Sequence, residues 1–247
     1  MPEGESDERS PITRVLIVDD HRAFSDALGI AIDLQPDLRH VGTAGAVDEA
    51  LEAIRDRPPD VVLMDVRLPG VDGIEGVRRI TALRPEVRVL VLTGFADADA
   101  MARAALAGAS GFFPKERPVG EILDAIRTAG RGGMVVEASV LASVLARVRE
   151  PERVPGGPPP LDLTDRQQEV LALMAEGLDP RAIARTLGIS LNTARGHIKG
   201  VMAKLGAHSQ LEAVVQAMHL GLLDPSGPGP GAGTGLGAGD PSGDGGA

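Results

Sequence analysis

The sequence predicts an α/β domain, a five-stranded doubly wound parallel sheet, followed by a small all-α domain of four helices. Two observations carry this prediction. Short apolar runs alternate with segments of helical apolar spacing through the N-terminal half and beyond. A Pro/Gly-rich stretch at 149–160 then leads into a shorter unit, in which polar caps and glycines delimit four helical segments.

The alternating unit contains five strand–helix pairs. The predicted strands are 14–20, 38–44, 61–64, 87–93 and 110–113, and the predicted helices are 22–34, 47–54, 74–83, 98–107 and 119–129. The strands are nearly continuous apolar runs, as in parallel sheets with both faces covered by helices. Such units commonly wind in the order 2-1-3-4-5, which places the first and third strands side by side.

Composition excludes several classes of protein. The chain has no Cys, which excludes disulfides, thiol nucleophiles and Cys-ligated zinc. No apolar run approaches the ~20 residues of a membrane span, and the polar N-terminus is unlike a signal peptide. We therefore expect a cytoplasmic protein without membrane contact. The net charge of −10 argues against nonspecific coating of nucleic acid, but it leaves room for a local basic patch.

The chain divides into five predicted segments. The ends are expected to be disordered because their composition is polar or Gly-rich and cannot form a core. The segments are a disordered N-terminus (1–11), the α/β domain (12–131), a connecting helix and Pro/Gly linker (132–160), the four-helix domain (161–223) and a disordered Gly-rich tail (224–247).

Charged and polar residues stand where the predicted strands end. Asp19 and Asp20 end the first strand, Asp65 the third and Thr93 the fourth, and Lys115 follows the fifth. Because the carboxyl ends of parallel strands meet at one edge, we expect these side chains to converge there. Each residue alone also fits a simpler role: a solvated carboxylate, a strand threonine, a surface lysine, or Asp20 as a helix N-cap.

This group of residues suits phosphoryl chemistry. Adjacent carboxylates repel one another, and a hard cation such as Mg²⁺, bound through oxygen, relieves the repulsion. Asp65 can then act as a nucleophile on phosphorus. Lys115 would offset charge on the phosphoryl oxygens, and the hydroxyl of Thr93 would hydrogen-bond one of them.

The second unit has the pattern of helix-capping and helix-terminating residues that is typical of a helix-turn-helix domain. Caps and glycines delimit its helices: Thr164 and Gly177 for the first, Asp179 and Gly188 for the second, Ser190 and Gly206 for the third, and about 209–220 for the fourth.

The third helix of this unit carries the candidate DNA contacts. An apolar stripe at spacings of four, three and four would face the core. The polar positions away from it are Asn192, Arg195 and Lys199, flanked by Thr193, His197 and Lys204. Arg, Lys and Asn suit base edges and phosphates in double-stranded DNA, and Ser190 at the helix N-terminus suits a phosphate. The alternative is a solvated charged face, because this unit is not net basic.

Four motifs resemble those of two-component receiver domains, which have a flavodoxin-like fold. They are "VLIVDDH", "LMDVRLPGVDGIE", "VLTG" and "GASGFFPKE", in order over 12–131. The resemblance implies Asp65 as the phosphoacceptor from a sensor histidine kinase. It implies Mg²⁺ on Asp19, Asp20, Asp65 and the backbone carbonyl of Arg67, phosphoryl contacts from Thr93 and Lys115, and a switch aromatic at Phe112. Gly94 and Pro114 depart slightly from the pattern.

The second unit resembles LuxR-type helix-turn-helix domains through "LTDRQQEVLALMAEG", "IARTLGIS", "TARGHI" and "KLGA". The resemblance implies a recognition helix at 191–205, a fourth helix that serves as a dimerisation surface, and a homodimer in the active state, with RNA polymerase as a further partner. Gly200 and Gln210 replace a usual Asn and a usual Arg or Lys. The two resemblances together indicate the NarL/FixJ arrangement of transcription regulators.

Three functional hypotheses follow. The first is a DNA-binding transcription regulator, not a turnover enzyme, controlled by phosphorylation of Asp65. The second is an orphan regulator that binds DNA without physiological phosphorylation. The third is a phosphohydrolase, which the sequence disfavours because Arg67 stands where such enzymes carry a second Asp. Bulky Arg67 and Phe95 near the acceptor also predict slow autodephosphorylation.

Overall fold

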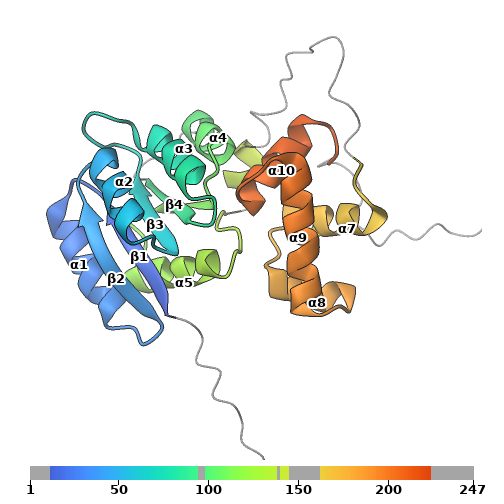
Figure 1. Cartoon of the computed structure of the whole chain (residues 1–247), viewed down its shortest axis with the longest axis horizontal. Helices are drawn as coiled ribbons and strands as arrows, with labels where there is room; N and C mark the ends of the chain where they lie inside the picture. Colours follow the sequence, from blue (N-terminus) through green and yellow to red (C-terminus); the bar gives the residue numbers. More distant parts are fainter. Residues whose placement is uncertain (1–11, 94–97, 138–139, 145–161, 224–247) are drawn as a thin grey trace, which may run out of the picture.

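The computed structural model describes residues 12–93, 98–137, 140–144 and 162–223. The expectations for 1–11, 224–247, most of the linker, Gly94 and Phe95 lie outside these residues. None of the described helices has the length and apolarity that a membrane crossing requires. An α/β domain and a helical domain lie side by side (Figure 1).

The sheet has the expected order, β2-β1-β3-β4-β5, with all strands parallel. Its strands are β1 (Thr13–Val18), β2 (Leu38–Ala44), β3 (Val61–Asp65), β4 (Arg88–Thr93) and β5 (Gly111–Pro114). The helices between and after them are α1 (Arg22–Asp33), α2 (Val47–Asp56), α3 (Gly73–Leu83), α4 (Ala98–Leu106) and α5 (Val119–Gly130). β1 ends at Val18, before the two aspartates that the sequence prediction had included in the strand.

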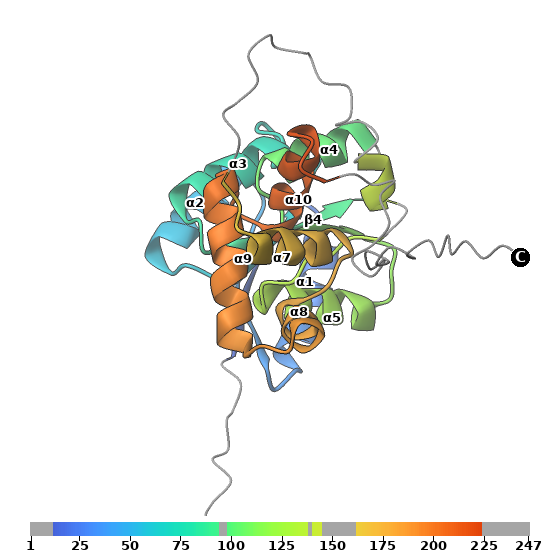
Figure 2. The same cartoon turned by 90° about the vertical axis from the view of Figure 1, so that its right-hand side faces the viewer.

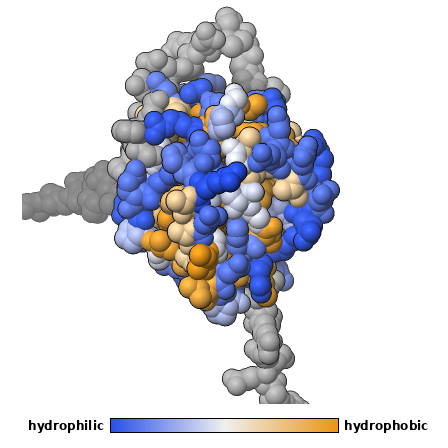
Figure 3. Space-filling model, turned by 90° about the vertical axis from the view of Figure 1, so that its left-hand side faces the viewer, coloured by the Kyte–Doolittle hydropathy of each residue, from blue (hydrophilic) through white to orange (hydrophobic). Residues whose placement is uncertain are grey.

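Alternate residues of each strand enter two different apolar cores. Val15 and Ile17 pack with residues of α1 and α5, whereas Leu16 and Val18 pack with residues of α2, α3 and α4 on the other face. This is the period-2 geometry of a strand that is covered on both sides. Figure 3 views the molecule from the side of the α/β domain and shows scattered apolar spots on a mostly hydrophilic surface.

The segment after α5 pairs with the outer edge of β5. Gly111 forms a parallel bridge with Val135, and the backbone N–H of Phe112 donates to the Val135 carbonyl at 2.7 Å. A Cβ on Gly111 would lie 2.0 Å from that carbonyl oxygen, so only glycine allows this approach. Beyond it, residues 140–144 are helical, as expected for a connecting helix.

The helical domain consists of α7 (Asp165–Ala175), α8 (Pro180–Leu187), α9 (Leu191–Leu205) and α10 (Gln210–His219). Polar side chains cap the first three helices as predicted: Thr164 in a capping box, Asp179 before Pro180, then Ser190. Ser209 caps α10. Gly188 and Gly206 end α8 and α9 in the left-handed conformation. Val170, Met174, Ile183, Ala194 and Val201 lie in one core.

The two domains meet where α10 packs against α4 (Figure 2). Leu211 and Val215 of α10 are fully buried in the apolar cluster of the α/β domain that contains α4. Three hydrogen bonds cross the same contact: Ser209 Oγ to the Ala109 carbonyl (2.7 Å), Gln210 Nε2 to the Gly132 carbonyl (2.6 Å) and Arg88 Nη1 to the His208 carbonyl (2.7 Å). We call this contact the junction.

Candidate functional site

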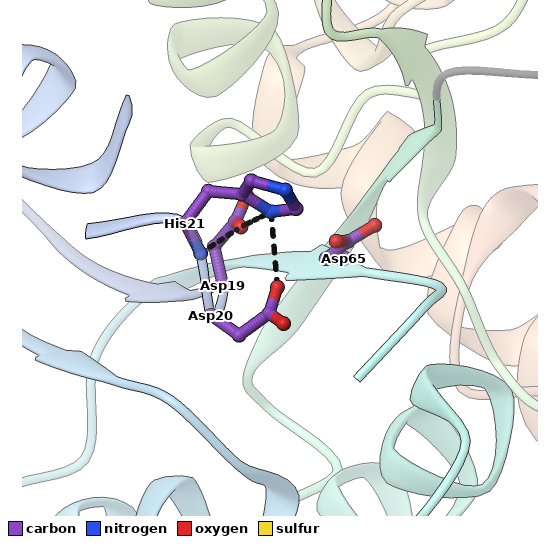
Figure 4. A group of neighbouring side chains, drawn as sticks. All are labelled: Asp19, Asp20, His21 and Asp65. Carbon is purple, nitrogen blue, oxygen red and sulfur yellow. Dashed lines mark hydrogen bonds and ion pairs between the residues drawn. The ribbon is translucent and has the colours of Figure 1, made fainter. Parts of the chain in front are cut away.

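An acidic pocket lies at the carboxyl ends of β1 and β3 (Figure 4). We define it by Asp19, Asp20, Asp65 and Lys115. Ligand atoms of the three aspartates and of His21 all lie within 4.8 Å of one another. Asp19 is 1% exposed and Asp65 is 5% exposed, so the pocket holds buried carboxylates. The sheet order therefore brings together the residues that the sequence placed at one edge.

Lys115 compensates the charge of the two buried carboxylates. Its ammonium Nζ lies 2.6 Å from Asp19 Oδ2 and 2.8 Å from Asp65 Oδ2. Burial of the ammonium alone would lower the pKa of Lys115, but the hydrogen bonds that it donates to Asp19 and Asp65 outweigh this effect and raise the pKa. The backbone N–H of Lys115 donates to the Thr93 carbonyl at 3.1 Å, which ties the loop after β5 to the end of β4.

His21 is a pocket neighbour that the sequence reasoning missed. Its ring is largely exposed. Its Nδ1 nevertheless lies 3.2 Å from Asp19 Oδ1 and 3.0 Å from Asp20 Oδ1. Asp20 does not cap α1, contrary to the simpler role considered for it: His21 is the N-cap residue and forms no side-chain cap. In the sequence, His21 directly follows Asp19 and Asp20, and this adjacency could have indicated that it lies beside the pocket.

The donor set of the pocket fits a hard divalent cation. Oxygen atoms of three carboxylates, from Asp19, Asp20 and Asp65, lie within 4.8 Å of one another, and oxygen donors are what Mg²⁺ prefers. Arg67, whose carbonyl the resemblance adds to this set, lies on the exposed loop two residues after β3. That loop is held close to Asp65, because the Arg67 N–H donates to Asp65 Oδ1 at 3.3 Å.

The two remaining expected residues occupy different surroundings. Thr93 is half-buried at the last position of β4, one strand away from Asp65, and pairs in register with Pro114 of β5. Phe112 is 5% exposed and belongs to the same apolar cluster as Leu211 and Val215 of α10. One continuous cluster thus connects the expected switch aromatic to the junction.

The expected DNA contacts lie along α9. Asn192, Thr193, Arg195 and Lys199 are exposed, and His197 is half-buried. Ser190 is the helix cap, because its Oγ accepts from the Thr193 N–H at 3.1 Å and lies 2.8 Å from the Thr193 hydroxyl. Lys204 is bound within its own domain: its ammonium donates to Gln167 Oε1 at 2.8 Å and to the Asp162 carbonyl.

The α/β domain faces part of this helix. A cleft of about 780 Å³ runs between the domains, and Arg195 and Lys199 line it on the α9 side. Asp60, Glu86 and Arg131 line it on the other side. A DNA duplex that takes such a helix into its major groove requires free space around the helix. In this arrangement, acidic and basic side chains of the α/β domain, with Arg88 beside those just named, stand opposite Arg195 and Lys199 and limit the free space on that side of α9.

Both departures from the LuxR pattern have a structural explanation. A Cβ on Gly200 would lie 2.8 Å from Gln167 Nε2, and the Gln167 side chain is fixed in the α7 capping box and by Lys204. Gly200 thus allows α7 to approach α9 closely. Gln210 is 4% exposed in the junction, where the charge of a buried Arg or Lys would require a partner.

Comparisons with known proteins agree with both resemblances. The family model of the response regulator receiver domain matches residues 15–127, and that of bacterial regulatory proteins, luxR family, matches 161–217. The transcriptional regulatory protein LiaR of Bacillus subtilis (strain 168) is 34% identical over 204 residues, which cover 83% of this chain and 96% of LiaR.

Two further matches extend this agreement. The DNA-binding transcriptional activator DevR/DosR of Mycobacterium tuberculosis is 33% identical over 218 residues, covering 88% of this chain and 100% of that protein. The crystal structure of a LuxR-family two-component response regulator from Aurantimonas sp. SI85-9A1 has a TM-score of 0.51 and 29% identity, over 55% of this chain and 97% of that one.

Proposed function

Because the chain belongs to the two-component response regulators that join a receiver domain to a LuxR-type DNA-binding domain, we propose that phosphorylation of Asp65 by a sensor histidine kinase controls its binding to DNA. One observation carries this proposal. Asp65, Asp19 and Asp20 converge with the ammonium of Lys115, which lies 2.8 Å from the carboxylate of Asp65. A buried carboxylate beside other carboxylates and one cation is suited to accept a phosphoryl group.

In the proposed reaction, a carboxylate oxygen of Asp65 attacks the phosphorus of a phosphohistidine. A P–O bond forms, the P–N bond breaks, and the imidazole nitrogen keeps the electron pair and takes up a proton from solvent. Asp19, Asp20, Asp65 and the Arg67 carbonyl would hold Mg²⁺, which neutralises negative charge when bound. Lys115 would move its ammonium from Asp65 Oδ2 to a phosphoryl oxygen, and the Thr93 hydroxyl would donate to another.

Through the junction, a change in the pocket would alter the position of the DNA-binding domain. Phe112 packs in the apolar cluster that also buries Leu211 and Val215, so a rotation of its ring would disturb the surface that holds α10. We propose that phosphorylation opens the junction, frees α9 from the α/β-domain side of the cleft and exposes α10. Two chains would then form a homodimer and present Arg195 and Lys199 to DNA half-sites.

Further parts of the proposal concern partners and the lifetime of the phosphorylated form. The regulator would contact RNA polymerase at promoter DNA. It would act in the cytoplasm, where it can reach both the kinase and DNA. Phosphorylated Asp65 is expected to hydrolyse slowly, because Arg67 near the acceptor offers no group that activates water. Phe95, the second residue behind this expectation, lies outside the described ranges.

The assignment of Asp65 is tested by labelling with radioactive acetyl phosphate and Mg²⁺. Asp65→Asn should abolish acid-stable, base-labile incorporation, because an amide is not a nucleophile of this kind. Asp26→Asn is the matched control, since Asp26 is an exposed aspartate of α1, and it should be labelled normally. Undiminished labelling of Asp65→Asn would place the acceptor elsewhere.

The coupling to DNA is tested with sequences selected from a random pool. Binding should tighten roughly tenfold or more on phosphorylation if dimerisation and release act together. Equal affinities of the two forms would instead favour a regulator that does not depend on phosphorylation. Arg195→Ala should weaken binding in both forms, which identifies α9 as the helix in contact with DNA.

A further inference from the structure

Phe24 of α1 contacts the ammonium that serves the acceptor. Lys115 Nζ lies 5.4 Å from the centroid of the Phe24 ring. Phe24 is half-buried, and the apolar cluster beneath α1 and α5 supports it. The face of an aromatic ring attracts a cation within about 6 Å, because the ring quadrupole is negative there. The ring therefore contacts the Lys115 ammonium as well as the apolar core.

The ring differs from the other two neighbours of the ammonium in one respect. Asp19 is needed for the cation and Asp65 for the phosphoryl group, so both carboxylates acquire new partners during the proposed reaction. The ring binds neither a hard cation nor a phosphoryl group. The ring is therefore available to attract Lys115 before, during and after transfer.

We propose that Phe24 is a positioning residue for phosphoryl transfer, because its ring keeps the ammonium of Lys115 in the pocket while Asp19 and Asp65 exchange partners. This inference rests on the proposed function of Asp65. It adds a residue that neither contacts the reacting atoms nor belongs to the motif at the pocket aspartates. Phe24 acts only through Lys115, and its test must therefore separate ring electrostatics from ring packing.

Fluorinated phenylalanines separate these two effects. The full chain is prepared with 4-fluoro-, 3,5-difluoro- or 3,4,5-trifluorophenylalanine at position 24, which weakens the negative face of the ring with little change of shape. The rate constant for labelling Asp65 should fall with each fluorine, by roughly fivefold for the trifluoro ring. The same series at Phe113, which packs against the same cluster, should leave the rate constant unchanged.

Simple substitutions provide a second comparison. Phe24→Leu should slow labelling as the trifluoro ring does, and Phe24→Tyr should restore it because a ring face is present again. Equal thermal unfolding midpoints for the fluorinated chains would show that the fold is unaffected. A flat rate series at position 24, or equal slopes at positions 24 and 113, would overturn the role of Phe24.

A spectroscopic readout needs no phosphoryl transfer. The sequence has lysines at only three positions, 115, 199 and 204, so ¹⁵N-lysine labelling gives few ammonium resonances and Lys115→Arg assigns the one of interest. In the unphosphorylated chain, this resonance should shift progressively along the fluorine series at position 24, and an unmoved resonance would refute the contact. Absence of labelling in the unsubstituted chain would overturn the function of Asp65, whereas normal labelling with a flat series would overturn only Phe24.

Discussion

The acidic pocket and the junction both join residues that are distant in sequence, but they use different chemical groups. In the pocket, ammonium and carboxylate side chains meet, as in the pair Lys115–Asp65. At the junction, each of the three hydrogen bonds ends on a backbone carbonyl, that of Ala109, Gly132 or His208. The pocket can therefore be recognised in the sequence from its charged residue types. The junction cannot, because every residue has the backbone carbonyl that its hydrogen bonds use.

The two regions also differ in what their stability depends on. The pocket is part of the sheet and forms whenever the sheet does. The junction depends on a few apolar side chains, such as Leu211 and Val215, each contributing roughly 1.5–3 kcal/mol when buried. Gln210 Oε1 is buried there without a hydrogen-bond partner among the described residues, which lowers the net stability of the contact.

The largest expected effect comes from Gly73→Ala beneath the pocket. An added Cβ would lie 2.0 Å from the Asp65 carbonyl oxygen. The backbone that holds the acceptor must then shift, so we expect roughly 2–4 kcal/mol lower free energy of unfolding and strongly reduced labelling. Urea denaturation measures the first effect. Gly120→Ala in α5, where no atom lies within 4 Å, should be neutral or slightly stabilising; equal losses in both variants would contradict this account.

Opening the junction should have the next largest effect. Leu211 is fully buried by the receiver domain and is absent from the core of the helical domain. Leu211→Asp should therefore open the junction without unfolding α10, and tighten DNA binding by the unphosphorylated chain roughly tenfold to a hundredfold. Small-angle scattering should show a more extended molecule. Leu222→Asp, at a position 40% exposed, should change neither quantity, and unaltered affinity in Leu211→Asp would speak against a closed resting form.

A smaller effect is expected from an ion pair within the receiver domain. Hydrogen bonds from Arg127 to Asp37 hold the pKa of that carboxyl below its ordinary value of 3.8. This stabilisation is present above pH 3.8 and is lost as the pH falls through the lower folded-state pKa. Asp37→Asn should cost roughly 0.5–1 kcal/mol at neutral pH, a difference that shrinks in acid. Asp124→Asn, which removes an exposed partner of Arg127, should cost less.

The smallest effect, with the opposite sign, is expected at the junction. Burial raises the pKa of Glu212 above its ordinary value of 4.5, against hydrogen bonds from His208. A raised carboxyl pKa means that its share of stability is greatest below pH 4.5 and declines as the pH rises through the folded-state pKa. Glu212→Gln should flatten this decline by roughly 0.5 kcal/mol or less. Unfolding followed from pH 4 to 8 measures it; a stability that rises more steeply with pH in the parent chain than in the variant would be inconsistent with a raised pKa.

The sequence allowed most of the fold to be predicted, because periodicity and capping are local signals. The expected strand at 61–64 and the caps Thr164 and Ser190 were found within a residue of their positions. The sheet order was confirmed, and with it the convergence of Asp19, Asp65 and Lys115. Their roles in phosphoryl transfer stay predictions.

What the sequence did not reveal depends on side-chain direction and domain docking. His21 and Phe24 were not recognised as neighbours of the pocket, because spacing does not tell which neighbour a ring touches. Gln210 and Gly200 were noted only as departures from a pattern, and their burial or close approach became visible in the structure. No periodic signal connects residues 209–210 with 109 and 132.

The pairing of Gly111 with Val135 has a consequence for behaviour at high concentration. It occupies the outer side of β5 with the protein's own backbone, and so blocks that side to strands from other molecules. If the LuxR-type domain moves away as proposed, this position of β5 therefore stays paired within the chain. We expect this internal pairing to disfavour edge-to-edge association of two molecules through β5.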